Sequence, residues 1–154
     1  MTSTQAPSYP QLKLKRGSER TVANGHPWVS SGAVDQAPDT PPGAVVDVVD
    51  HRGRFLGRGF YNTRSAIRAR LLTQDRRRPV DGEFVAAAVR QALELRRRTD
   101  LYGYTDALRL VHGESDGLPG LVVDEYAGFL VVQFHTHGME ALRAEVLDAL
   151  WSER

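Results

Sequence analysis

The sequence of 154 residues contains no cysteine. Without a thiol the chain can form no disulfide, no thiolate zinc site and no cysteine nucleophile. It also lacks an apolar run near the roughly 20 residues that a membrane-spanning helix needs. Its first ten residues, MTSTQAPSYP, have neither the basic start nor the apolar stretch of a secretory signal. We therefore expect no membrane partner, a cytoplasmic location, and a disordered lead-in over residues 1–10.

Charge is distributed unevenly along the chain, although the net charge is only +1. Residues 1–80 hold thirteen lysines and arginines against six acidic residues, whereas residues 81–154 hold seven against thirteen. A basic first half is typical of a surface that binds a polyanion such as nucleic acid. The alternative is that arginine is simply abundant in the source proteome, since Lys13 and Lys15 are the only lysines.

Residue types used in catalysis and metal binding are present without the spacing that those activities require. Gly53, Gly57 and Gly59 match neither a dinucleotide fingerprint nor a phosphate-binding loop, and Gly57 and Gly59 are expected to mark a bulge or a close approach of the backbone. His135 and His137 would share one strand face, but no third ligand accompanies them, so no metal site is predicted. No serine lies in a nucleophile-elbow motif. The sequence thus indicates binding more clearly than catalysis.

The first half has the pattern of a small β-rich domain, because short apolar segments alternate with turn residues. In LKLKR, Leu12 and Leu14 are expected to point inward, with the lysines between and after them pointing outward. Ser18 and Gly25 are expected to bound a short helix over residues 19–24. Strands are expected at 44–50, 55–61 and 65–72, a proline-rich surface connection at 35–43, and a linker at 75–80.

The segment SAIRARLL shows the clearest two-residue period and is predicted to place Arg64, Arg68 and Arg70 on one strand face. Such a face can contact phosphates, or it can be a solvated edge that discourages aggregation. Trp28 is expected in the core because burial of a large ring is favourable, with base stacking as the alternative. The candidate RNA-binding residues are Lys13, Lys15, Arg16, Arg20, Arg64, Arg68 and Arg70 for phosphates, and His26 and Trp28 for base contact or stacking.

The second half is predicted to follow the order helix, hairpin, strand, helix. Asp81 is expected to cap a helix over residues 82–98, and the closing run Arg96, Arg97 and Arg98 is expected to favour the helix dipole, with RNA contact as the alternative. A strand is expected at 129–134, before a helix that is followed by no turn and no partner strand, so we expect the second domain to be unfinished. The apolar positions of the two helices are Phe84, Val85, Ala88, Val89, Ala92 and Leu93, and Met139, Leu142, Val146 and Leu150.

The hairpin is predicted from LRLVHGESDGLPGLVV at residues 108–123, where two apolar segments flank a dense cluster of turn residues. Glycine and proline at a turn are ordinary, so the loop can be a hairpin and nothing more. The alternative is a functional loop in which Glu114, Ser115 and Asp116 face a partner. A small enzyme that uses His112, Glu114 or Asp116 is the corresponding catalytic hypothesis.

Three stretches together resemble a known family: HPWVSSGAV at 26–34, VDVVDHRGRFLGRGFYN with SAIRAR within 46–70, and LRLVHGESDGLPGLVVDEYAGFLVVQ at 108–133. They resemble the N-terminal portion of the PUA-containing class I SAM-dependent methyltransferases that modify cytosine C5 in large-subunit (23S) ribosomal RNA. The resemblance implies a mixed β and α+β fold, with a PUA-like β-barrel over 11–74 and an incomplete central α/β domain over 81–154.

The resemblance further implies that this chain is the RNA-binding front of an rRNA methyltransferase, with ribosomal RNA as its partner. The family's cofactor, S-adenosylmethionine, and its catalytic cysteine belong to a C-terminal domain that has no counterpart here, so no cofactor site and no catalytic residue are predicted. The covalent step needs a thiolate, and we expect the chain to be inactive alone, with its methyltransferase domain separate or missing. The alternative is a truncated fragment without independent activity.

Overall fold

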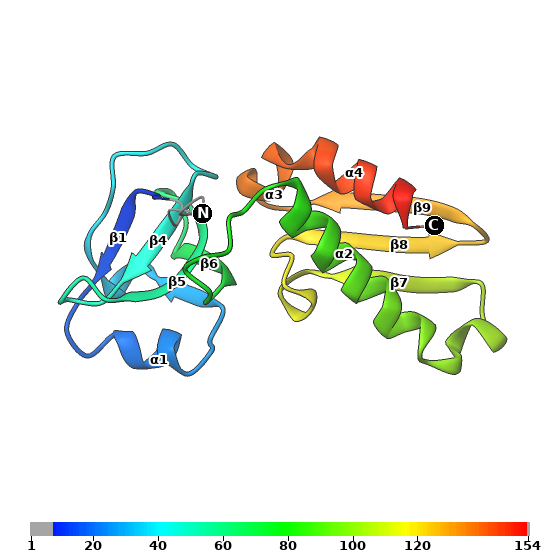
Figure 1. The fold of residues 1–154 in the computed structure, drawn as a ribbon, viewed down its shortest axis with the longest axis horizontal. Coiled ribbons are helices and arrows are strands. Elements are labelled where there is room, and N and C mark those ends of the chain that lie inside the picture. Colours follow the sequence, from blue (N-terminus) through cyan, green and yellow to red (C-terminus); the bar gives the residue numbers. More distant parts are fainter. Residues whose placement is uncertain (1–7, 154) are drawn as a thin grey trace, which may run out of the picture. The chain divides into compact units, whose positions relative to one another are not determined.

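A computed structural model describes residues 8–153, which form two compact units that divide between Val80 and Asp81. Unit 1 ends at Val80 and unit 2 begins at Asp81 (Figure 1). Within this range, no helix combines the length and the apolar character that a membrane span requires. Each unit has its own buried core, so each is described separately.

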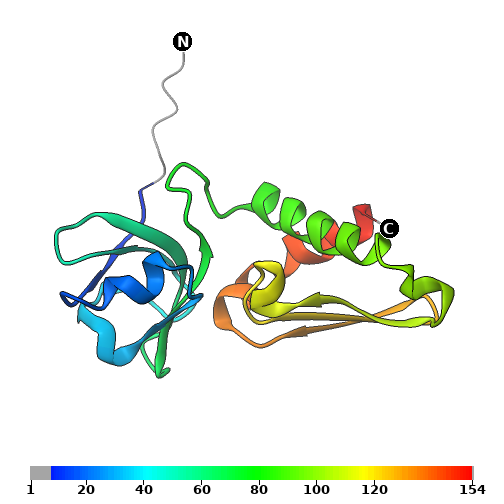
Figure 2. The same cartoon turned by 90° about the horizontal axis from the view of Figure 1, so that it is seen from below.

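Unit 1 is built on one six-stranded sheet of order β2-β6-β5-β4-β1-β3, in which only the β1–β4 pair is parallel. The edge strands β2 and β3 are joined by the three residues of η1, which forces the sheet to curl back on itself (Figures 1 and 2). The elements are β1 (Gln11–Leu14), α1 (Glu19–Ala23), β2 (Trp28–Ser30), η1 (Ser31–Ala33), β3 (Val34–Gln36), β4 (Val45–Val49), β5 (Phe55–Tyr61) and β6 (Ile67–Thr73).

The core of unit 1 lies inside this curl and confirms the predicted alternation in β1. Leu12 and Leu14 are fully buried, whereas Lys13 is half-buried and Lys15 is exposed. Val22 attaches α1 to the same core, which is why a helix of only five residues is stable here. The remaining buried members are Val29, Val46, Val48, Tyr61, Ala69 and Leu71.

Unit 2 is a three-stranded antiparallel sheet of order β7-β8-β9, with α2 and α4 on one of its faces (Figure 2). The Asp81 carboxylate accepts the Phe84 N–H at 2.9 Å, as the predicted helix cap requires. All six predicted apolar positions of α2 are buried. The elements are α2 (Gly82–Arg97), η2 (Asp100–Gly103), β7 (Ala107–His112), η3 (Gly113–Asp116), β8 (Leu121–Tyr126), β9 (Phe129–Phe134), α3 (His137–Ala141) and α4 (Arg143–Ser152).

Two predictions about connections in unit 1 are wrong. The proline-rich surface connection was predicted to begin at Asp35, but β3 extends to Gln36 because β1 offers it an antiparallel partner. The predicted disordered lead-in fails at Tyr9 and Pro10, since the Pro10 carbonyl accepts the Asp47 N–H at 2.9 Å and Tyr9 is held as described below. Residues 1–7 of that lead-in lie outside the described residues.

Two predictions about the C-terminal part also require correction. The predicted single helix is divided at Leu142, whose backbone leaves the helical region, into α3 and α4. His135 and His137 do not share a strand face, because His137 is the first residue of α3. Across residues 8–153 no group of three potential metal ligands is found.

The bulge or close backbone approach predicted from Gly57 and Gly59 occurs where β5 pairs with β6. The register between these strands shifts at Arg58 and Gly59, and a Cβ atom on Gly59 would lie 2.8 Å from the Cα atom of Leu71. Such a separation is shorter than van der Waals contact, and the obstacle is backbone that cannot rotate away.

We expect Gly59→Ala to destabilise the protein by about 2 kcal/mol or more, because the β5–β6 pairing must open to admit the methyl group. Urea unfolding would measure the change. Gly32→Ala is the matched control, since a Cβ atom there meets nothing within 4 Å, and it should stay within about 0.5 kcal/mol of wild type. Equal stability of the two variants would contradict the prediction.

Candidate nucleic-acid interface

A groove of about 380 Å³ lies on unit 1, where α1 faces β2 and η1. It combines hydroxyl groups with one indole and one imidazole, a set that offers both hydrogen bonds and a flat apolar surface. The lining residues are Ser18, Thr21, Val22, His26, Trp28, Val29, Ser30, Gly32, Ala33 and Ile67. The groove therefore brings together two of the residues predicted for base contact.

Trp28 is exposed rather than buried in the core, which corrects the expectation for its ring. It lies on the edge strand β2, where Val29 points inward and is buried, so that Trp28 and Ser30 must point outward. Its side chain retains 41% exposure. Strand alternation therefore outweighs the general tendency of large rings to be buried.

Two cationic or titratable side chains surround the Trp28 indole. Arg70 lies opposite Trp28 in the β2–β6 ladder, and its guanidinium carbon is 5.2 Å from the ring centroid. The His26 ring stands edge-on at 5.9 Å, and His26 Nδ1 accepts the Trp28 N–H at 3.1 Å. The aromatic surface is thus held in place beside a positive charge, which is the arrangement that stacking and phosphate contact both use.

The predicted lysines and arginines of the N-terminal segment take different positions. The Lys15 ammonium donates to the Gly32 carbonyl at 2.9 Å, which attaches it to the wall of the groove. Arg16 and Arg20 are exposed around α1, whereas Lys13 is half-buried in the middle of the sheet between its partners in β3 and β4. None of Lys13, Arg16 and Arg20 lines the groove.

The predicted stripe of three arginines on one strand face is wrong for Arg64. The Asn62 side chain accepts the Arg64 N–H at 2.9 Å, and the Ser65 hydroxyl accepts the Ile67 N–H at 3.1 Å. These local bonds make a turn, so β6 begins only at Ile67 and Arg64 precedes it. Arg68 and Arg70 alternate with the buried Ala69 and share the outer face.

Three groove residues were missed by sequence reasoning. Ser18, Thr21 and Ser30 line the groove with hydroxyl groups. Ser18 was predicted only as a helix cap, yet its side chain makes no capping hydrogen bond to α1. Serine and threonine occur throughout such loops, and no spacing distinguished these three from the others.

The loop of the unit 2 hairpin is tied to α2 by a nearly buried ion pair. Arg96 donates from both terminal nitrogens to Asp116, at 2.6 and 2.9 Å, and the His112 N–H donates to the same carboxylate at 2.6 Å. The Asp116 side chain is only 4% exposed. Arg96 also donates to the Arg109 carbonyl at 3.1 Å. Arg96 stands in the last turn of α2, where the helix dipole favours a cation as expected, and its contacts in addition connect the helix to the loop.

This geometry favours the structural interpretation of the hairpin loop over the catalytic one. Both Asp116 oxygens accept hydrogen bonds from the Arg96 guanidinium or the His112 N–H, so the carboxylate is fully engaged in holding the loop. Asp124 is similar: the side-chain hydrogen bonds from Arg109, at 2.8 and 3.0 Å, keep the pKa of Asp124 below its usual value. A carboxylate whose pKa is lowered in this way, as that of Asp124 is, is suited to ion pairing and not to general acid catalysis.

Unit 2 exposes an apolar groove of about 910 Å³ between β9 and α4. Phe129 and Trp151, at its two sides, are 77% and 88% exposed. The remaining lining residues are Gly128, Leu130, Val132, Leu147 and Leu150. A contiguous apolar surface of this kind marks an interaction site in most soluble proteins.

Comparison with known proteins identifies the class of unit 1. Residues 12–74 match the model of the PUA-like domain family, in agreement with the curled six-stranded sheet. Over 151 residues the chain is 42% identical to the "Ribosomal RNA large subunit methyltransferase I" of Salmonella arizonae, and 40% identical to that of Salmonella paratyphi B. The alignment covers 97% of this chain and 38% of each relative. The predicted resemblance to this family is confirmed.

Solved structures agree with both units of the fold. A protein assigned as a SAM-dependent methyltransferase from Streptococcus mutans superposes with a TM-score of 0.78 over 94% of this chain and 38% of its own, at 16% identity. A methyltransferase complexed with SAH gives a TM-score of 0.81 at 17% identity, over 94% of this chain and 37% of its own. The chain thus spans less than two fifths of the proteins it matches, and it shares the fold of that part.

We expect Asp116→Ala to destabilise unit 2 by about 3 kcal/mol, because it leaves the Arg96 guanidinium and the His112 N–H without their acceptor in a nearly buried site. The control is Glu94→Ala, which removes the exposed partner of Arg98 and should cost less than about 1 kcal/mol. Urea unfolding followed by circular dichroism would compare them. A small and equal loss for both would show that the loop is not held by this ion pair.

Proposed function

We propose that this chain is the RNA-binding front portion of a ribosomal RNA methyltransferase and docks structured ribosomal RNA for a catalytic domain outside the chain. The observation that supports this proposal best is the groove of unit 1, where Trp28 is exposed beside Arg70 on the more basic half of the sequence. An exposed indole with a guanidinium over its face is suited to an unpaired base and its phosphate.

Each candidate residue has a distinct role in this proposal. Trp28 provides a face on which an unpaired base stacks, and His26 holds that face through its hydrogen bond to the Trp28 backbone. Arg70, over the Trp28 ring, and Lys15, bonded to the Gly32 carbonyl, contact the adjoining phosphates. Arg16, Arg20 and Arg68 supply longer-range attraction from exposed or half-buried positions, and Lys13 and Arg64 contribute less.

The described residues do not fit S-adenosylmethionine. Nucleotide-type cofactors in open α/β sheets bind at the carboxyl ends of parallel strands that are followed by helices, whereas the sheet of unit 2 is antiparallel throughout. The single parallel pair in residues 8–153, β1 with β4, belongs to the curled sheet of unit 1. We therefore derive no methyl-transfer step from these residues and propose that the cofactor site and the catalytic cysteine belong to the remaining part of the protein. We also propose that the protein acts in the cytoplasm.

The apolar groove of unit 2 supports a second role, the docking of further polypeptide. We propose that its occupant is the methyltransferase domain, since the relatives have more than half of their length beyond the part matched here. Phe129 and Trp151 would then be covered in the longer protein. This proposal also accommodates the alternative that the chain has no independent activity.

Binding to a fluorescently labelled fragment of structured ribosomal RNA would test the RNA-binding role. We expect Trp28→Ala to weaken binding by about tenfold or more, since stacking on an aromatic side chain contributes about 1–3 kcal/mol per base. Arg70→Gln should weaken binding and make its salt dependence shallower by about one phosphate contact. The control is Tyr104→Ala, an exposed ring on unit 2. Equal affinity for RNA of wild type, W28A and R70Q would contradict the proposal.

Amide exchange would test the docking role of unit 2. In the 154-residue chain we expect β9 and α4, which line the uncovered groove, to exchange faster than β5 and β6 of unit 1. Both β9 and α4 should be protected in a longer protein that includes the methyltransferase domain. Equal protection of β9 with and without that domain would show that the groove is not its docking site.

A further inference from the structure

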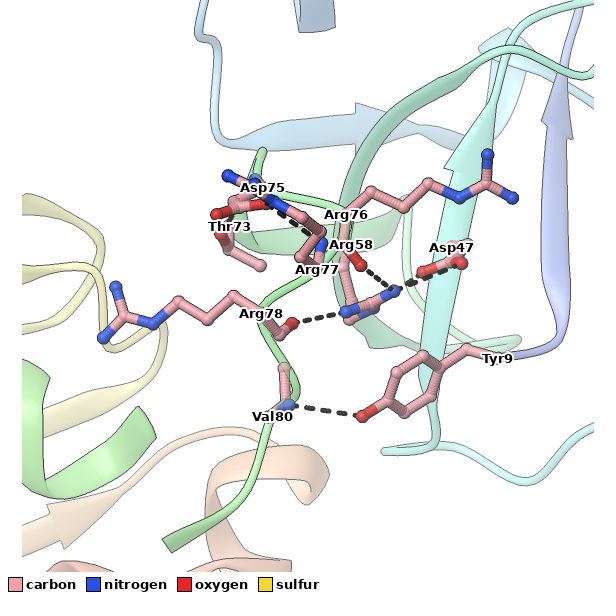
Figure 3. Close-up of polar contacts among 9 residues, drawn as sticks. All are labelled: Tyr9, Asp47, Arg58, Thr73, Asp75, Arg76, Arg77, Arg78 and Val80. Carbon is pink, nitrogen blue, oxygen red and sulfur yellow. Dashed lines mark hydrogen bonds and ion pairs between the residues drawn. The ribbon is translucent and has the colours of Figure 1, made fainter. Parts of the chain in front are cut away.

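An arginine-rich loop, residues 74–79, lies near the end of unit 1 and overlaps the linker predicted at 75–80. Arg76, Arg77 and Arg78 are consecutive and exposed in this loop. Figure 3 shows that the backbone of this segment and of the following Val80 is nevertheless held by the side chains of Arg58 and Tyr9. We call this segment the arginine loop.

The main attachment is the guanidinium of Arg58 in β5, which is completely buried. Arg58 Nε donates to Asp47 of β4 at 2.7 Å, and its terminal nitrogens donate to the backbone carbonyls of Arg76, at 3.2 Å, and of Arg78 (Figure 3). A buried cation is costly unless all its donors are used. Here two of the acceptors that satisfy it are carbonyls of the arginine loop.

Tyr9 completes the attachment from the N-terminal side. Its ring lies against the Arg58 guanidinium, 4.2 Å from ring centroid to guanidinium carbon, and its hydroxyl accepts the Val80 N–H at 3.2 Å (Figure 3). Within the loop, Asp75 accepts the Arg77 N–H at 2.9 Å and donates its own N–H to the Thr73 hydroxyl at 3.0 Å. The backbone is therefore fixed by hydrogen bonds at Asp75, Arg76, Arg77, Arg78 and Val80.

Although the backbone of the arginine loop is fixed, the side chains of its three arginines are exposed. The Arg77 side chain is 87% exposed, and its Nε lies 3.4 Å from the Asp75 carboxylate, which makes a long ion pair. In Figure 3 the side chains of Arg76 and Arg78 extend in different directions away from the buried Arg58. Three positive charges thus project from a backbone that has already lost its conformational freedom.

We propose that the arginine loop is a second phosphate-binding site of unit 1, which contacts the sugar-phosphate backbone of the same RNA; this inference rests on the proposed RNA-binding function. A flexible linker needs no buried cation to hold it, whereas a binding loop gains from being ordered in advance because less entropy is lost when the ligand binds. The planar forks of three arginines match phosphate oxygens, and unit 1 is the basic half of the chain.

A salt titration of binding between the 154-residue chain and a labelled structured ribosomal RNA fragment tests the phosphate contacts. The triple variant Arg76→Gln, Arg77→Gln and Arg78→Gln should make the slope of log K against log salt shallower by about 2, as expected for the loss of about three contacts. The matched single comparison is Arg77→Gln with Arg52→Gln, since Arg52 is also an exposed arginine but belongs to the β4–β5 turn and not to the arginine loop. Arg77→Gln should change the slope and Arg52→Gln should not.

Tyr9 variants test whether the fixed backbone matters, because they change no charge. Tyr9→Ala should weaken RNA binding at least about threefold without changing the salt slope, and the triple variant should cost less affinity in the Tyr9→Ala background than in wild type. Tyr9→Phe retains the ring and loses only the hydroxyl, so its RNA affinity should lie between those of wild type and Tyr9→Ala. Unfolding by urea would verify that each variant remains folded at the binding temperature.

The outcomes separate this inference from the function on which it rests. Wild-type chain that binds no RNA at low salt would overturn the RNA-binding function and, with it, the arginine loop as a site. RNA binding that is lost in Trp28→Ala but keeps its full salt slope in the triple variant would overturn the inference alone. An affinity that is unchanged by Tyr9→Ala would refute the role of the fixed backbone.

Discussion

The two edge strands of unit 1 are joined by the three residues of η1, and this short connection determines where the candidate interface lies. Because β2 and β3 stand at opposite ends of the strand order, so short a link can exist only if the sheet curls until its edges meet. The curl buries Leu12, Leu14 and Val29 inside. The groove that contains Trp28 and His26 is lined by residues of α1, β2 and η1.

Two buried or nearly buried arginines have comparable structural roles in the two units. Arg58 fixes the end of unit 1 through two loop carbonyls, and Arg96 fixes the hairpin loop of unit 2 through Asp116. In both places a guanidinium satisfies acceptors in a connecting segment, namely two carbonyls of the arginine loop for Arg58 and the Asp116 carboxylate of η3 for Arg96. Both connections are rich in polar residues, and charge-assisted hydrogen bonds help to hold them.

The two units differ in the surfaces that they leave open. Unit 1 presents a polar and aromatic groove with basic residues around it, as an RNA-binding surface requires. Unit 2, the acidic half, presents an apolar groove beside the edge strand β9, a surface that is better suited to another protein domain. This contrast agrees with the proposed roles, in which unit 1 binds RNA and unit 2 binds the catalytic domain.

The sequence by itself determined the parts of the fold that depend on local pattern. Two-residue alternation identified the buried leucines of β1, helical spacing identified the six buried positions of α2, and Asp81 was correctly predicted as the cap. Paired glycines indicated the close approach of β5 to β6. The quoted motifs were sufficient to predict the resemblance to the rRNA methyltransferases.

Tertiary structure alone decided which of the many arginines are exposed and what each one contacts. Arg58 and Arg77 look alike in the sequence, yet one is completely buried and the other is 87% exposed. Burial of a guanidinium depends on acceptors that come from distant segments, here Asp47 and the carbonyls of the arginine loop. Exposure of Trp28 likewise depends on β2 being an edge strand. Local periodicity contains no information about such partners, because they meet only after the sheet has closed.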